Sequence, residues 1–280
     1  MLINFEKKFI LLLYLGKGCR LTMKVLAIMG TPRKKNTYKM IQIFEEGLKK
    51  NGVGNLDFEY LFLEELDIGF CQSCFSCYHK GEETCPKAEK TLDVLKKITK
   101  AEGLIFASPV YADNLTALMK NFIDHFAFMH HRPRLFDKKA IIFSTTHETG
   151  TEYTMQFLKQ TARRWGCEVV DTVGVRMMQF NYKEEYRRNF EKNMNKLAIK
   201  FIKAFETNWR DSPSLSDLIW FRIMRVWTFY IGKEVNQTDY NYWKDHEWFD
   251  KKYYVPVKIN PFKNLLASFI SWRVKRAIKR

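Results

Sequence analysis

As far as about residue 210, short apolar runs alternate along the chain with longer segments in which apolar residues recur every three or four positions. Such runs are typical of strands buried on both faces, and the periodic segments are typical of helices with one buried face. The runs predict strands at 24–29, 58–63, 103–108, 139–144 and 168–175. The periodic segments predict helices at 37–51, 92–101, 115–128, 151–165 and 184–209.

This regular alternation predicts an α/β fold in which a parallel five-stranded sheet carries helices on both faces. Right-handed crossovers then place the loops that follow the strands along one edge, where ligands bind in such sheets. Thr37 is expected to cap the first helix, and Gly166 to close the fourth.

The run Ser212-Pro213-Ser214 marks a change in character, because the residues after it are rich in aromatic and basic side chains. We therefore expect a domain at 23–210 and a C-terminal extension at 211–280. Pro261–Arg280 is expected to form a basic helix with Phe262, Leu265, Leu266, Phe269 and Ile270 on one side. The apolar stretch at 218–231 is interrupted by two arginines, so it should not span a bilayer.

The first 22 residues contain a short apolar stretch, Phe9–Leu15, behind two lysines. It is too short to cross a membrane. We expect Met23 rather than Met1 to be the natural start and 1–22 to be an upstream extension, with a short membrane-targeting leader as the alternative.

The composition indicates the size of the core and, through its net charge, the kind of partner. A chain of 280 residues with 46% hydrophobic content can bury one full core and carry an appendage. Its net charge of +16 favours anionic partners, although solubility and a basic tail explain it equally well. For the C-terminal extension, packing on the core or across a dimer is favoured first, peripheral contact with an anionic membrane second, and nucleic acid a distant third.

The loop Gly30–Thr37 joins a buried strand to a helix start, which is a common place for a phosphate. Backbone N–H groups there are joined by side-chain donors from Thr31, Asn36 and Thr37 and by the charge of Arg33. The second and third glycines of a dinucleotide loop are missing, so ATP and a Rossmann-bound NAD are disfavoured. An ordinary strand-to-helix turn is the alternative.

Two further loops follow later strands of the predicted sheet. Pro109, Val110 and Tyr111 end the third strand and offer an apolar wall and close backbone to a flat ring. In the next loop His147 and Glu148 are interpreted as a solvated pair without an acid–base role.

Four cysteines, Cys71, Cys74, Cys77 and Cys85, form the most informative cluster of the chain. The first three are spaced so that their thiolates can turn onto one centre, and Pro86 follows the fourth. The run resembles a ferredoxin-type ligand set with a longer last gap. An iron–sulfur cluster, a zinc ion, a redox disulfide and no metal at all remain open. Such a cysteine cluster suits a reducing compartment, where it more often binds metal than forms disulfides.

Together, Gly30-Thr31-Pro32-Arg33, Asn36-Thr37, Ser108–Tyr111, Asn114 and Lys120–Asp124 resemble the NADPH-dependent FMN reductase family over roughly 23–205. The cysteine run resembles the iron–sulfur flavoprotein branch, although Ser73 and the lack of an Asp pair after Cys85 depart from its pattern. The resemblance implies a flavodoxin-like fold, FMN at the strand ends, a homo-oligomer, and NAD(P)H or a ferredoxin-like protein as electron donor. It implies FMN contacts from Thr31, Arg33, Asn36, Thr37, Pro109, Val110, Tyr111 and Asn114, and a [4Fe–4S] cluster on the four cysteines.

The sequence therefore predicts a cytoplasmic, FMN-dependent NAD(P)H oxidoreductase. The alternative is a flavodoxin-like scaffold without catalysis that binds a membrane surface or a protein through 211–280.

Overall fold

A single parallel sheet forms the centre of the computed structural model, which describes residues 22–52, 55–207 and 210–279. Its strand order is β2-β1-β3-β4-β5, and all neighbouring pairs are parallel. The strands are β1 (Met23–Met29), β2 (Leu56–Phe62), β3 (Gly103–Pro109), β4 (Lys139–Thr146) and β5 (Glu168–Arg176). This order is the flavodoxin-like arrangement, so the predicted fold class is confirmed.

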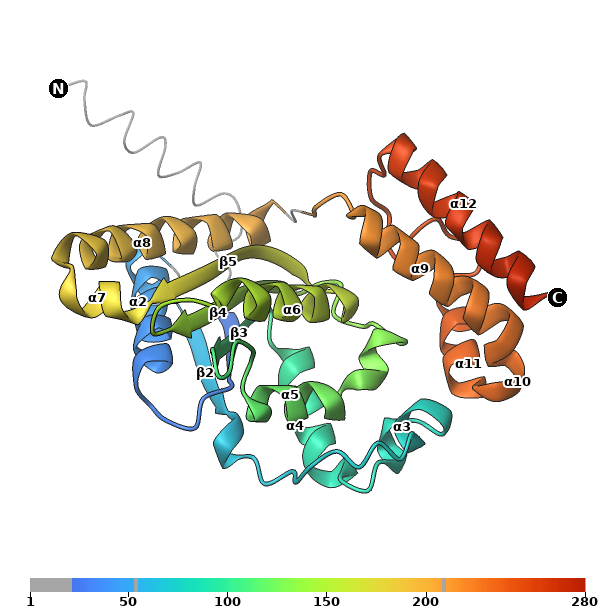
Figure 1. Cartoon of the computed structure of the whole chain (residues 1–280), viewed down its shortest axis with the longest axis horizontal. Helices are drawn as coiled ribbons and strands as arrows, with labels where there is room; N and C mark the ends of the chain where they lie inside the picture. The colour runs from blue at the N-terminus through green and yellow to red at the C-terminus, as the bar shows by residue number, and fades with distance from the viewer. Residues whose placement is uncertain (1–21, 53–54, 208–209, 280) are drawn as a thin grey trace.

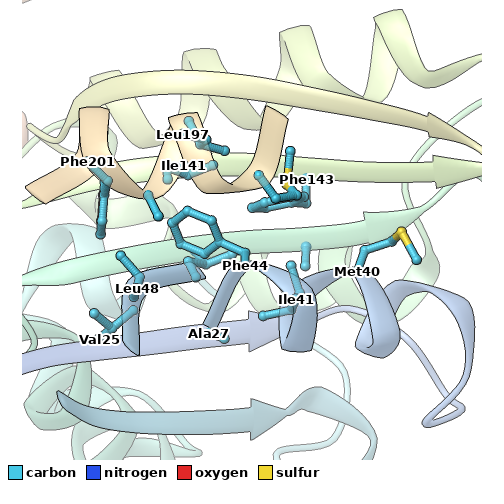
Figure 2. Close-up of a cluster of buried hydrophobic side chains, with 14 of the residues drawn as sticks. Val25, Ala27, Met40, Ile41, Phe44, Leu48, Ile141, Phe143, Leu197 and Phe201 are labelled. Carbon is cyan, nitrogen blue, oxygen red and sulfur yellow. The ribbon is translucent and has the colours of Figure 1, made fainter. Parts of the chain in front are cut away.

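Helices cover both faces of the sheet (Figure 1). One face is covered by α2 (Asn36–Lys50) and α8 (Glu184–Glu206), and the other by α4 (Ala88–Lys100), α5 (Ala117–His125) and α6 (Thr151–Arg164). Figure 2 shows Phe44 of α2 and Phe201 of α8 in the apolar layer between helices and strands. These rings meet with centroids 5.8 Å apart, in an edge-to-face contact that suits aromatic pairs.

Helix ends are where the structure departs from the sequence prediction. Thr37 does not cap α2, because Lys35 occupies the cap position and Thr37 is buried inside the first turn. The helix expected over 115–128 ends at His125 and continues as the 3₁₀ helix η3 (Ala127–His130). The short helix α7 (Met177–Tyr182) was not predicted.

The end of α6 agrees with the prediction. Gly166 has φ of 108°, a conformation that residues with a side chain rarely adopt. The N–H groups of Gly166 and Cys167 donate to the carbonyls of Arg163 and Ala162, which is the hydrogen-bond pattern of a Schellman motif.

The chain after residue 210 forms further helices beside the α/β layers (Figure 1). They are α9 (Leu215–Trp227), the π-helix η4 (Thr228–Gly232), α10 (Lys233–Val235), α11 (Gln237–Asp245) and α12 (Pro261–Ile278). Their own core contains Phe221, Met224, Trp243, Trp248 and Tyr254, and Phe136 of the α/β part packs against it. The favoured packing on the α/β core is thus observed, whereas packing across a dimer stays a prediction. The predicted boundary at 210 stays a prediction, and the expected extension at 1–22 lies almost wholly outside the described residues.

Throughout 22–52, 55–207 and 210–279, every helix is too short or too polar to cross a membrane.

Candidate functional site

The carboxyl edge of the sheet has its topological switch point between β1 and β3. The loop after β1 leads into α2 on one face, whereas the loop after β3 leads into α5 on the other. The two loops diverge there, and in doubly wound sheets ligands bind at such a switch point. The predicted phosphate loop and the predicted ring-binding loop are therefore neighbours.

The first loop presents the start of α2 to this edge. No side chain caps the α2 N-terminus, so its backbone donors are not satisfied by a cap and suit an anion. Asn36 is the first residue of the helix and is exposed. Thr31 is buried, and its hydroxyl donates to the carbonyl of Arg33 (2.9 Å), which closes the turn before the helix.

Gly30 lets this loop approach the neighbouring helix. A Cβ at this position would lie 2.8 Å from Cβ of Met119 on α5, closer than real Cβ atoms come. The Gly30 N–H donates to the Ala107 carbonyl (2.8 Å), and the hydroxyl of Thr116 donates to the Gly30 carbonyl (2.7 Å). The loop is thus held against β3 and the start of α5.

Side chains connect the loops of three different strands. The Thr37 and Thr145 hydroxyls lie 2.7 Å apart in a buried hydrogen bond that joins α2 to the end of β4. Arg33 Nη2 donates to the Tyr111 hydroxyl (3.3 Å), although the two residues are 78 positions apart. The structure therefore brings both halves of the predicted FMN set together.

The second loop makes a tight turn. Tyr111 and Asn114 exchange two backbone hydrogen bonds, of 2.8 and 3.0 Å, around Ala112 and Asp113. Ala112 and Asp113 both have positive φ, of 47° and 60°, as a type I′ turn requires and as residues with side chains rarely tolerate. Strain of this kind is concentrated at functional sites. Pro109 and Val110 are partly exposed beside this turn.

The third loop is open to solvent. His147 and Glu148 are 79% and 60% exposed, with 4.0 Å between Nδ1 and Oε1. This agrees with their interpretation as a solvated pair.

The four cysteines line one cavity of about 350 Å³, away from the strand ends. All four are free thiols, and Cys74 is the most exposed of them. Ser73 and Phe75, which flank Cys74, both have a left-handed backbone with φ of 52° and 57°. Backbone of this kind turns successive N–H groups toward one side, as in many anion and iron–sulfur sites. Residues 69–86, which we call the cysteine segment, therefore form a concave surface.

The thiols differ in their electrostatic surroundings. Burial first, and then the neighbouring Cys85, raise the pKa of the Cys77 thiol to about 11. The Cys74 thiol donates a hydrogen bond to the Ser76 hydroxyl (3.5 Å), and contact with Ser76 lowers the Cys74 pKa. Within the described residues, no three or more His, Cys, Asp or Glu side chains are arranged to hold a metal ion.

Helix α5 links the two candidate sites. Its first residues follow the tight turn at the sheet edge, and the side chains of Lys120 and Asp124 line the cysteine cavity. Asn121 Oδ1 accepts from the Cys71 N–H (2.9 Å), and its Nδ2 donates to the Gly69 carbonyl (2.7 Å). The start of the cysteine segment is thus attached to α5.

A buried arginine, which the sequence reasoning missed, attaches the far end of the cysteine segment to the C-terminal helices. Arg132 Nη2 donates to the Cys77 carbonyl (2.5 Å) and to Glu82 Oε2 (3.2 Å). Its Nη1 donates to Oδ1 of Asp239, a fully buried residue of α11. Asp239 Oδ2 also faces His131 Nδ1 at 2.7 Å. No local pattern signals this contact, since 107 residues separate the two charges.

Helix α11 also contacts the backbone of the cysteine segment directly. The Thr238 hydroxyl donates to the His79 carbonyl (2.7 Å). We refer to Arg132, Asp239, Glu82, His131 and Thr238 as the arginine network.

The sequence is similar to those of two curated iron–sulfur flavoproteins. An iron–sulfur flavoprotein of Archaeoglobus fulgidus is 28% identical over 228 residues, which cover 80% of this chain and 98% of that protein. An iron–sulfur flavoprotein of Clostridioides difficile is 28% identical over 200 residues, which cover 70% of this chain and 85% of that protein.

Solved structures with the same fold include an azoreductase from Bacillus anthracis, with a TM-score of 0.52 and 17% identity over 64% of this chain and 100% of that one. An NAD(P)H:quinone oxidoreductase from Methanothermobacter marburgensis has a TM-score of 0.50 and 16% identity over 68% of this chain and 99% of that one. Residues 23–181 match the family described as NADPH-dependent FMN reductase. The chain belongs to this family and is an NAD(P)H-dependent flavin oxidoreductase.

Proposed function

We propose that the sheet edge holds FMN through the eight residues expected from the sequence. The uncapped start of α2, with Thr31, Arg33, Asn36 and Thr37, suits the doubly charged phosphate. The turn made by Pro109, Val110, Tyr111 and Asn114 suits the edge of a flat ring. Two observations support this assignment: the Arg33–Tyr111 hydrogen bond joins the phosphate side to the ring side, and the turn is strained.

FMN, when bound, accepts reducing equivalents from NAD(P)H and passes them on, while the protein supplies position and electrostatics. Arg33 fixes the orientation of Tyr111, which is 41% exposed at the mouth of the site. The solvated pair of the third loop takes no proton-transfer role.

We further propose that Cys71, Cys74, Cys77 and Cys85 hold a [4Fe–4S] cluster. The observation that carries this proposal is that four free thiols line one cavity whose wall is α5. A cluster is broader than a single ion, so its thiolates stand further apart than ligands of one metal. Lys87 N–H donates to Cys85 Sγ (3.5 Å), the kind of contact that stabilises a ligating thiolate.

FMN at the sheet edge and a cluster on the four cysteines would lie toward the two ends of α5, and the cluster would supply one-electron transfer. NAD(P)H or a ferredoxin-like protein serves as donor, and a reducing compartment such as the cytoplasm keeps the thiols free. We also propose a homo-oligomer, as the family resemblance implies. A scaffold without catalysis is disfavoured, because the family match covers both flavin loops.

An anaerobic UV–visible spectrum, before and after dithionite, tests this function together with iron and sulfide analysis. Flavin bands with a broad shoulder and about four iron atoms per chain are expected. Cys77→Ser should lose iron and keep FMN, whereas Cys167→Ser, at a buried thiol outside the cavity, should keep both. Flavin without iron, or zinc in its place, would contradict the cluster. A colourless protein that fails to take up added FMN would contradict the flavin site.

A further inference from the structure

The outer face of α12 carries a row of large apolar side chains. Phe262, Leu265, Phe269 and Trp272 are spaced by three or four residues, so they lie on one side of the helix. They are 68%, 66%, 58% and 50% exposed. Single exposed apolar residues are ordinary, but a continuous row of four marks an interaction surface. We refer to these four residues as the α12 stripe.

The opposite side of α12 fixes this orientation. The buried residues of the helix are the small Ala267 and Ser271. The Arg222 guanidinium of α9 donates to Asn264 Oδ1 (2.6 Å) and to Ser268 Oγ (2.9 Å). Turning the stripe inward would break these bonds and leave the buried Arg222 without them. Figure 1 shows α12 packed along α9 at the end of the molecule farthest from the sheet.

The charge around the stripe has a single sign. Residues 251–280 contain nine Lys and Arg residues and no Asp or Glu. Arg273 and Arg276 of α12 are exposed, and the Arg276 guanidinium lies 5.7 Å from the Trp272 ring. A second copy of this helix would therefore bring like charges together, which opposes self-association through the stripe.

We propose that the α12 stripe docks on an anionic lipid surface. An apolar face flanked by Lys and Arg is the pattern of a helix that lies in the interface plane. The apolar side chains enter the acyl boundary, Trp272 sits at headgroup depth, and each basic residue near the surface adds electrostatic attraction to the anionic lipid. The helix lies on the membrane, since none of the described helices is able to cross one.

Co-sedimentation of the full chain with vesicles tests the proposal. We expect binding to phosphatidylcholine vesicles that contain phosphatidylserine, little binding to pure phosphatidylcholine, and a loss of binding as salt rises. The double variant Phe269→Gln/Trp272→Gln should bind about tenfold more weakly or worse, as should Arg273→Gln/Arg276→Gln.

The matched control removes two exposed aromatic residues elsewhere. Tyr153 on α6 and Tyr182 on α7 are 71% and 85% exposed, and Tyr153→Gln/Tyr182→Gln should bind as the natural chain does. All variants should unfold at the same temperature, because the changed side chains are exposed.

Three outcomes would overturn the proposal. They are no vesicle binding, equal binding to neutral and anionic vesicles, and unchanged binding after Phe269→Gln/Trp272→Gln. Light scattering that shows a stripe-dependent dimer without lipid would assign the stripe to a second copy instead. Vesicle binding through the α12 stripe does not depend on the flavin or cluster assignment, and those assignments do not depend on vesicle binding.

Discussion

The sheet edge and the cysteine segment are two candidate sites on one α/β core, and they are held in place by different means. Each loop of the sheet edge is the continuation of a buried strand, and hydrogen bonds such as Thr37–Thr145 only refine its position. The cysteine segment does not directly continue a strand, and it contains two short helices, α3 (Ser76–His79) and the 3₁₀ helix η2 (Glu82–Thr84). It is attached by side chains of α5 and by the arginine network.

The two sites should therefore respond differently to the loss of a single side chain. A loop fixed by strand topology keeps its place when one side chain is lost. A segment fixed by a few long-range polar contacts depends on each of them. Four measurements test this difference between the two sites.

The largest effect is expected at Asp239. Asp239→Asn keeps the shape of the side chain but removes one of the two carboxylates that pair with the buried Arg132 and leaves it with Glu82, so stability should fall by about 3 kcal/mol in urea unfolding. Reaction of Cys77 with a thiol reagent should become faster, while FMN affinity stays the same.

Glu184→Gln serves as its control, because the Glu184–Arg188 pair is exposed on both sides and should be worth less than about 1 kcal/mol. If Asp239→Asn cost no more than this control, the arginine network would not hold the cysteine segment.

The next largest effect is expected at the proposed FMN site on the sheet edge. Arg33→Ala/Thr37→Ala removes a charge and a hydroxyl from the proposed phosphate site, so the dissociation constant for FMN should rise about 10- to 100-fold. Flavin fluorescence titration measures it, and iron content should not change.

Lys34→Ala is the control from the same loop, since the Lys34 ammonium pairs with Glu65 at 2.8 Å. An FMN affinity that is equal in the double variant and the natural chain would show that the phosphate binds elsewhere.

A smaller effect on stability is expected when the pH is lowered. It comes from His130, which lies in the segment that connects α5 to Arg132. Burial, followed by the charge of Arg164, lowers the His130 pKa to about 4. The unfolded chain takes up this proton below about pH 6.5 and the folded chain does not, so this residue's contribution to stability falls as pH drops from 6.5 toward 4.

Between pH 7.5 and pH 5 the loss from His130 should be about 2 kcal/mol. His130→Gln should flatten the measured stability profile by that amount. Parallel profiles for the variant and the natural chain would contradict a buried, neutral imidazole.

The smallest effect is expected at the start of α9. Ser214 caps this helix and forms a capping box with Asp217, so Ser214→Ala should cost about 1 kcal/mol. A single unfolding transition that shifts as a whole would mean that 211–280 unfolds together with the core. A separate early transition would support the predicted domain boundary at 210.

Much of the core was predictable because its signals are local. Continuous apolar runs such as Lys139–Ser144 identify strands that are buried on both faces, and the alternation with helices determines that the strands are parallel. Helix ends were less predictable, because the cap of α2 and the early end of α5 depend on contacts with other elements.

The fold class, the sheet edge at which the proposed FMN loops meet and the grouping of the four cysteines were all predictable from the sequence. Each of these follows from spacing along the chain and from the chirality of crossovers. The tertiary structure, and not the sequence, shows that Arg132 contacts Asp239, that Arg33 contacts Tyr111, and that α12 turns its large apolar residues outward. The physical reason is that these contacts join distant residues, and their energies depend on burial, which no local pattern records.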